Sequence, residues 1–193
     1  MYDFYIEEIH MRLFHVSEEK EIKIFHPRKP SRKDLVESVP LVWAIDEKRL
    51  PNFLTPRDCP RVTYHKNHQT SDEDCQRFFS SSTSTHVVAI EQAWFDVMKT
   101  TTLYIYEFDS KHFILQDAIA GYYVSKHSEV PIACHVIKDP FQALFDRGVE
   151  LRVLDHLIDL RDQVILSTLN WSMCRMAHAK PKPNQDDKIG QVF

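Results

Sequence analysis

The chain has 193 residues, a length typical of one domain, and 43% of them are hydrophobic, which excludes a disordered chain. Its formal net charge is −4, so a nucleic-acid binder that relies on its overall electrostatic field is excluded. Only three glycines are present, which excludes a phosphate-binding loop and the glycine-rich dinucleotide fingerprint, because each needs several glycines in one short turn.

The cysteine pattern indicates a reducing environment. Cys59, Cys75, Cys134 and Cys174 form no C-x-x-C pair, and they lie in regions of different character. The sequence shows no signal peptide and no apolar run of about 18 residues. We therefore expect reduced thiols and a cytoplasmic protein with no membrane contact.

The chain begins with residues 1–10, which we expect to be an N-terminal extension. Alternating apolar positions predict a strand at Arg12–Val16. Ser17 then resembles a helix N-cap, and acidic residues follow it, so a short helical turn is expected over residues 18–23. Two prolines in Phe25–Lys33 predict an exposed basic loop.

The segment 41–62 combines several structural signals. It predicts a buried strand at Leu41–Ile45, a short helix at Glu47–Leu54 and a second strand from Arg61. Between these lies a turn bounded by Pro56 and Pro60, whose fixed φ angles should make it rigid. We expect Asp58 to accept hydrogen bonds there, from backbone N–H groups or from a guanidinium.

The polar segment His65–Thr85 predicts a long surface loop anchored by Phe78 and Phe79. A strand at His86–Ile90 and a helix at Glu91–Met98 should follow.

The remaining chain predicts more short elements. Strands are expected at Thr102–Phe108, Phe113–Leu115, Tyr122–Ser125, Pro131–Ile137 and Val149–Leu154, and helices at Asp139–Arg147, ending at Gly148, and at Leu157–Met176. The resulting set of about eight strands and about four helices predicts an α+β fold with a mixed, largely antiparallel split sheet. We expect one globular domain at 11–178 and a disordered tail at 179–193.

Several residues are candidates for ligand binding. His15 lies near the end of the first strand and is followed closely by Ser17, so its imidazole could bind ligand hydroxyls or act as a general base. The alternative is a half-buried histidine bonded to the backbone. We expect a cleft at the ends of the first two strands, lined by Tyr122. The side chains expected to approach its mouth are those of His15, Trp43, Arg57 and Arg28.

Arg57 and Arg61 flank Cys59, and two guanidiniums near one turn could clamp a phosphate or a carboxylate. Alternatively, one of them pairs with Asp58 and the prolines only rigidify the corner. A nucleophilic role for Cys59 would need a nearby base, which the sequence does not place.

Metal and acid–base sites are weakly indicated. His65, His68 and Cys75 are the closest group of metal-ligand types, but they lack a fourth ligand, so no metal is expected. The candidate carboxylates Glu91, Glu107 and Glu129 are not paired in the sequence.

Five segments together resemble an uncharacterised bacterial family of unknown function, DUF6886. They are LFHVSEE at Leu13, VWAIDE at Val42, LPNFLTPRDCPRV at Leu50, GYYVS at Gly121 and GVELRVL at Gly148. The resemblance covers most of residues 11–178 and implies no particular reaction.

The chain also distantly resembles the ADP-ribosyltransferase-like fold, through LFHVS, the aromatic Trp43 and the pattern GYYVSKHSEVP. That resemblance implies a split sheet and a transferase that uses nicotinamide adenine dinucleotide (NAD). The position of the family's catalytic glutamate is occupied by Gly121 or its neighbour, however. We therefore expect a nucleotide- or anion-binding cleft, non-catalytic or of unknown activity and without a resident cofactor, and the alternative is an NAD-using transferase.

Overall fold

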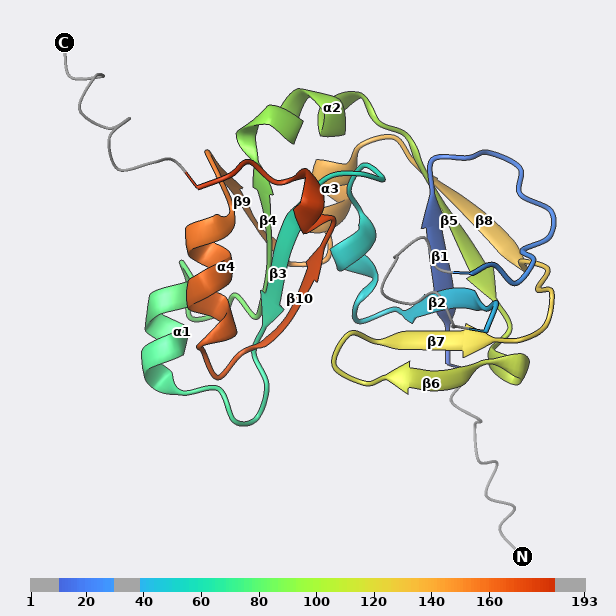
Figure 1. The fold of residues 1–193 in the computed structure, drawn as a ribbon, viewed down its shortest axis with the longest axis horizontal. Helices are drawn as coiled ribbons and strands as arrows, with labels where there is room; N and C mark the ends of the chain where they lie inside the picture. Colours follow the sequence, from blue (N-terminus) through green and yellow to red (C-terminus); the bar gives the residue numbers. More distant parts are fainter. Residues whose placement is uncertain (1–10, 30–38, 183–193) are drawn as a thin grey trace, which may run out of the picture. The chain divides into compact units, whose positions relative to one another are not determined.

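The computed structural model describes residues 11–29 and 39–182. The chain divides into two compact units. Unit 1 comprises Met1–Leu50 and Tyr104–Val136, and unit 2 comprises Pro51–Leu103 and Ile137–Phe193. In the described part the chain forms four α-helices and two sheets, of six and four strands (Figure 1). The predicted α+β class with mostly antiparallel strands is thereby confirmed.

Unit 1 is built on the six-stranded sheet, in the order β6-β7-β2-β1-β5-β8. Its strands are β1 (Leu13–Ser17), β2 (Val42–Asp46), β5 (Leu103–Phe108), β6 (Ile114–Asp117), β7 (Tyr122–Ser125) and β8 (Ala133–Ile137). A short 3-10 helix, η4 (Ser110–His112), precedes β6. β1 lies between β2 and β5 and is antiparallel to both.

One face of this sheet carries the core of unit 1. Leu13 lies opposite Phe108, and His15 lies opposite Tyr106, so these side chains share a face. Phe25 packs on that face, with its ring centroid 5.1 Å from that of Tyr106 and 5.0 Å from that of Phe108. The cluster is apolar and contains Leu13, Phe25, Val42, Ala44, Tyr106, Phe108 and Phe113.

The segment before Phe25 is fixed by a buried tyrosine. The Tyr106 hydroxyl donates to the Glu19 carbonyl at 2.8 Å and accepts from the Ile22 N–H at 3.0 Å. Phe25 then forms two backbone hydrogen bonds with Glu129, at 2.8 and 2.9 Å. Residues 18–28 therefore cover the core face as an ordered but irregular segment.

Unit 2 is built on the four-stranded sheet, in the order β10-β3-β4-β9. Its strands are β3 (Arg61–His65), β4 (His86–Glu91), β9 (Glu150–Leu154) and β10 (Asn170–Cys174). β3 is antiparallel to both of its neighbours, whereas β4 and β9 are parallel.

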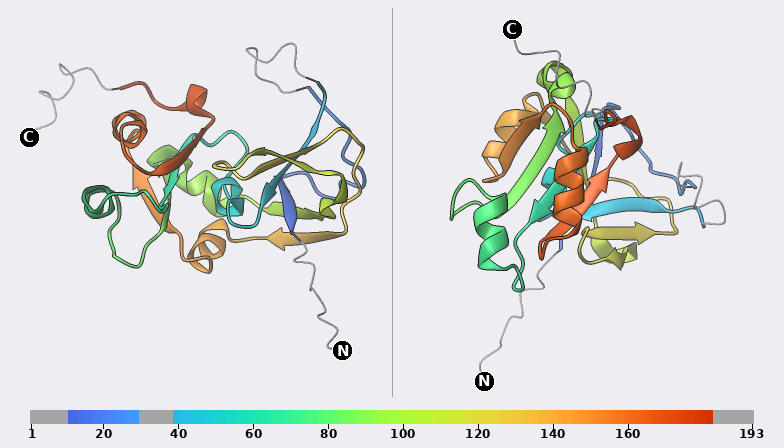
Figure 2. Two further views of the ribbon diagram at one scale, coloured as in Figure 1. Left: turned by 90° about the horizontal axis from the view of Figure 1, so that it is seen from below. Right: turned by 60° about the vertical axis from the view of Figure 1, so that its left-hand side comes forward.

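The helices of unit 2 are short. They are α1 (Asp72–Phe78), α2 (Phe95–Thr100), α3 (Pro140–Phe145) and α4 (Ile158–Ile165), with the 3-10 turns η2 (Leu50–Phe53), η3 (Gln92–Trp94) and η5 (Met176–His178). α1 and α4 pack on one face of the sheet, where Phe78 and Val164 join Val62 and Tyr64 in a buried core (Figures 1 and 2).

The structure corrects several predictions of local structure. Residues 18–23 form no helix, because the Ser17 hydroxyl accepts only from the Glu19 N–H, in a tight turn. The segment His65–Thr85 contains α1, which begins after Ser71 and has three acidic residues in its first turn. The expected five-turn helix over 157–176 is instead α4 followed by β10. At the end of α4 the Ser167 hydroxyl donates locally to the Val164 carbonyl, and the Thr168 hydroxyl donates to the carboxylate of Asp74 in α1.

Most strand predictions are confirmed, with ends shifted by one or two residues. The expected β7 agrees in both bounds, and Asp139 caps α3 as its position predicts. The helix expected at 47–54 is a turn followed by η2. The boundaries of the expected domain stay a prediction. Residues 1–10 and 183–193 lie outside the described residues, whereas Lys180 at the start of the expected tail donates its N–H to Glu91 at 2.9 Å.

Two glycines offer a matched test of packing at the ends of elements. Both have positive φ, +69° at Gly121 and +66° at Gly148. A Cβ at Gly121 would lie 2.6 Å from Arg49 Cγ and 2.8 Å from the Asp46 carboxylate, whereas one at Gly148 would meet nothing within 4 Å. We expect Gly148→Ala to lower the unfolding free energy by about 1–2 kcal/mol and Gly121→Ala to lower it further. Urea unfolding of both variants measures the difference, and equal losses would contradict the steric account.

Candidate functional site

The structure separates the side chains of His15 and Trp43. His15 Nδ1 lies 2.9 Å from the Trp43 carbonyl oxygen, so Nδ1 carries the proton and donates it. The strand register places Ala44, not Trp43, beside His15, and the Trp43 side chain therefore points to the opposite face. His15 contacts Phe25 on the covered face, with the two ring centroids 5.0 Å apart.

Trp43 and Tyr122 meet on the face of the sheet opposite His15. Their ring centroids are 5.5 Å apart with an interplanar angle of 89°. Trp43 pairs in register with Val124, and Val124 also pairs with Ile114 on β6. These partners define one face of β2, β7 and β6.

Ser17 and Arg28 occupy positions at the border of the sheet. The Ser17 hydroxyl accepts from the Glu19 N–H at 3.0 Å, and this bond closes the turn after β1. Arg28 is exposed, and its main chain forms an isolated bridge with Leu41 through two hydrogen bonds of 3.1 Å.

Arg57 and Arg61 belong to unit 2 and differ in exposure. Arg61 is only 4% exposed, and it donates Nε to the Asn52 carbonyl at 2.6 Å and Nη1 to the Cys59 carbonyl at 3.0 Å. Its guanidinium also lies over the Phe53 ring. Arg61 therefore closes the corner from inside, whereas Arg57 is exposed at the turn.

The corner between Pro56 and Pro60 forms the expected turn, with the Cys59 N–H bonded to the Pro56 carbonyl at 3.1 Å. Asp58 is 54% exposed, and its carboxylate lies 3.9 Å from the guanidinium of Arg175, a residue distant in sequence. Burial raises the pKa of the Cys59 thiol to about 12, which keeps it protonated and excludes it as a thiolate nucleophile.

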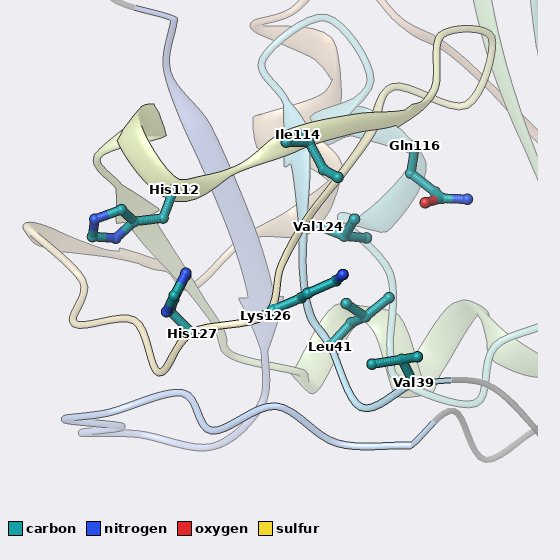
Figure 3. Close-up of a pocket in the computed structure, with 8 residues that line it drawn as sticks. All are labelled: Val39, Leu41, His112, Ile114, Gln116, Val124, Lys126 and His127. Atoms are coloured by element: carbon teal, nitrogen blue, oxygen red, sulfur yellow. The ribbon is translucent and has the colours of Figure 1, made fainter.

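A groove of about 470 Å³ lies on the Trp43 face of unit 1 (Figure 3). Its lining combines aliphatic side chains with nitrogen-bearing ones and consists of Val39, Leu41, His112, Ile114, Gln116, Val124, Lys126 and His127. Figure 3 shows His112 and His127 beside each other, with Leu41 and Val39 grouped on the other side of Lys126. Lys126 is exposed and forms no hydrogen bond or ion pair with the described residues.

A buried carboxylate stands behind the two imidazoles. Glu129 is 7% exposed, and it accepts a 2.5 Å hydrogen bond from the Ser125 hydroxyl. Its other oxygen lies 3.5 Å from His112 Nδ1, and the rings of His112 and His127 are 5.3 Å apart. The Ser125 hydroxyl also accepts from the His127 N–H at 3.0 Å, so one turn holds Glu129 and His127 in place.

The other two candidate carboxylates are engaged elsewhere. Glu107 accepts two hydrogen bonds from Arg12, at 2.8 and 3.0 Å, and lies 3.2 Å from His135. It pairs in register with Phe14 and so lies on the face opposite His15. Glu91 is buried in unit 2, where it accepts from the Lys180 N–H.

Sequence reasoning missed the groove. The segment SKHSE enters the sequence analysis only through a fold resemblance, and no pattern there singles out His112. The available signal was a cationic cluster, Lys126-His127, directly after a predicted strand, since strand ends often carry ligand-binding groups. Within residues 11–29 and 39–182, no group of three or more His, Cys, Asp or Glu side chains could hold a metal ion. No helix in that part of the chain has the length and apolar character needed to cross a membrane.

The corner in unit 2 predicts two different mutational effects. Arg61→Ala should lower the unfolding free energy by about 2–4 kcal/mol, because it leaves two buried carbonyls without a donor. Asp58→Ala should cost less than about 1 kcal/mol, because its ion pair is exposed and long. Denaturant unfolding of the two variants compares them directly, and a larger loss at Asp58 would contradict the assignment.

The Arg12–Glu107 pair predicts acid sensitivity. Hydrogen bonding to Arg12 lowers the pKa of Glu107 from its ordinary 4.5 to about 2. Its contribution to stability is therefore complete above about pH 4.5 and is lost as the pH falls toward about 2. The difference in unfolding free energy between the parent and Glu107→Gln should shrink between about pH 6 and pH 3.

Urea unfolding across that range is the measurement. Glu47→Gln is the control, since Glu47 makes a single contact with the same Arg12 and is 59% exposed. A parent-to-Glu107→Gln difference that does not change with pH would contradict the role of the pair.

The comparisons with known proteins give one match. Neither the curated proteins nor the solved structures contain a significant match to this chain. The model of a family of unknown function, DUF6886, matches residues 14–179. In the described part this range includes the four α-helices, the strands β2 to β10 and all of β1 except Leu13. The chain therefore belongs to the DUF6886 family.

Proposed function

We propose that this protein binds a nucleotide or a similar small anion with an apolar body in the groove of unit 1. The observation that carries the proposal is the composition of the groove. Lys126, His112 and His127 stand beside an aliphatic lining of Leu41, Val124 and Ile114. Such a pairing of apolar surface with a few nitrogen donors is typical of small-molecule sites, whose volumes run from roughly 300 to 1,000 Å³.

The cationic group with the most freedom is Lys126. Its ammonium has three donors and is not engaged within the described residues, so it can be directed toward a phosphate or a carboxylate. By contrast, buried Arg61 has Nε and Nη1 bonded to main-chain carbonyls. Binding is therefore assigned to the exposed cation and not to the buried one.

The residues predicted from the sequence differ in their position relative to this groove. Trp43 lies on the same face of the sheet, in register with Val124, and the main chain of Arg28 is bonded to Leu41, which lines the groove. His15 contributes indirectly, since it donates to the main chain of β2 from the opposite face. We keep a ligand contact for Trp43 and Arg28 as part of the proposal.

A second candidate function is a transferase on an ADP-ribosyltransferase-like scaffold with NAD as its substrate. One observation favours it, namely that Glu129 is on the same face as His15. Ser125 pairs with Val42, whose side chain belongs to the core that Phe25 covers, and Glu129 bonds both to Ser125 and to the main chain of Phe25.

The carboxylates fit such a centre poorly. A catalytic glutamate must be able to reach a sugar hydroxyl, whereas Glu129 is buried and engaged by Ser125 and His112. Glu107 is bound by Arg12 on the other face. We therefore rank binding above transfer and derive no catalytic step.

The compartment is part of the same proposal. All four cysteines are unpaired, including the exposed Cys134 and the buried Cys59. Unpaired thiols are typical of a reducing environment, which supports a cytoplasmic location.

The test is a binding titration of the whole chain with adenosine monophosphate (AMP), in which calorimetry or thermal unfolding detects binding. A ligand at about 100 times its dissociation constant should add roughly 2.7 kcal/mol to the unfolding free energy. Lys126→Glu should weaken binding at least about tenfold, because it places a like charge beside the anion.

Lys138→Glu is the matched control, since Lys138 is also exposed but belongs to unit 2. It should bind as the parent does. Equal loss in both variants, or no binding of AMP by the parent, would contradict the proposal. Adding NAD to the same series tests the second candidate. A transferase would release nicotinamide from NAD, and Glu129→Gln would abolish that release.

A further inference from the structure

The two imidazoles beside the groove indicate how its anion is held. Resting on the proposed function, we infer that the groove binds its anion together with a proton, which the His112–His127 pair takes up. The two rings come from different elements, His112 from η4 and His127 from the turn after β7. Their centroids are 5.3 Å apart, and both line the groove.

The carboxylate of Glu129 faces only one of the two imidazoles. Glu129 brings a single negative charge, at 3.5 Å from His112 Nδ1. Its other oxygen is occupied by the Ser125 hydroxyl, so the carboxylate is fixed toward His112. A second imidazolium at this separation would be repelled by the first and by the neighbouring Lys126, because like charges disfavour each other's charged form. An anion in the groove supplies the missing negative charge.

The other polar groups around the pair do not supply that charge. His26, from the segment that covers the core face, is bonded to the Ser128 hydroxyl at 2.9 Å. Asp109, which precedes η4, uses its carboxylate to accept from the Lys111 N–H at 2.9 Å. Among these neighbours, Glu129 is the acid whose carboxylate is directed at the pair.

The consequence is a coupling between pH and affinity. Histidine is the side chain whose charge changes between about pH 5 and 8. A ligand that prefers the doubly protonated pair must draw a proton from solution when it binds, and its affinity must rise as the pH falls. The ligand class is a compact oxyanion, such as the phosphate of a nucleotide, in contact with both imidazoles.

Inorganic sulfate is the appropriate probe, because its own charge stays constant over this pH range. Sulfate also stabilises proteins generally by exclusion from their surfaces, so thermal shifts would mislead. We therefore specify backbone amide NMR titrations of the whole chain at about pH 6 and pH 8, with ionic strength held by chloride. Affinity for sulfate at the groove should be about tenfold higher at the lower pH, as expected for an average uptake of about half a proton over these two pH units. In weakly buffered solution, binding should raise the pH.

His127→Asn should remove the pH dependence and the proton uptake, while leaving the contact between His112 and Glu129 in place. His68→Asn is the control, an exposed histidine of unit 2, and it should behave as the parent does. Thermal unfolding in chloride alone verifies that both variants fold.

Three outcomes would overturn the inference. They are equal affinity of the parent at both pH values, a pH dependence that persists in His127→Asn, and no sulfate binding at either pH. The proposed function is judged separately, since AMP bound in the groove with a pH-independent affinity would support binding and reject proton coupling.

Discussion

The backbone bridge between Phe25 and Glu129 is the interaction on which the site depends. These residues are 104 positions apart, and their two hydrogen bonds of 2.8 and 2.9 Å tie the covering segment to the turn after β7. The bridge buries the Phe25 ring against Tyr106 and Phe108, and it also fixes Glu129 beneath the surface. From there Glu129 meets Ser125 and faces His112. Burial of the Phe25 ring thus helps to position the polar groups behind the groove. The backbone bridge fixes the main chain of Glu129, and this restricts where its carboxylate can lie.

The pleat of the six-stranded sheet separates two roles that the sequence appeared to combine. His15 and Trp43 are close in space, yet the strand register directs their side chains to opposite faces. The His15 face is closed by residues 18–28, whereas the Trp43 face carries the groove. His15 therefore acts on the main chain of β2, and the open face is left to Lys126 and the imidazoles. Two residues at neighbouring strand ends indicate a shared cleft only weakly, unless the strand register shows that their side chains lie on the same face of the sheet.

The sequence predicted the elements whose signals are local. Alternating apolar residues identified β1, short apolar segments predicted β3, β4, β5 and β7, and Asp139 with Gly148 marked α3. It failed where the deciding contact is distant. Leu157–Met176 has the composition of a helix, but pairing with β3 draws Asn170–Cys174 into a strand, and tertiary pairing overrides a weak local preference. The groove was missed for a related reason, since His112 and His127 are 15 positions apart and meet only because β6 and β7 pair. The Pro56–Pro60 corner was read correctly as a turn, but burial of Arg61 could not be read from its sequence.

The two units show why basic residues cannot be assigned to ligands by sequence position alone. Arg61 is a buried cation, and it is tolerable there because main-chain carbonyls of Asn52 and Cys59 accept its hydrogens. A ligand would have to compete with those carbonyls and expose the corner that they form. Lys126 is in the opposite condition, since it is solvated and lies beside aliphatic surface. The free energy of binding an anion is most favourable where the cation is already near the surface and its donors are not required by the fold. Exposure and engaged donors therefore distinguish Arg61, whose donors the fold uses, from Lys126, the cation on which the proposal rests.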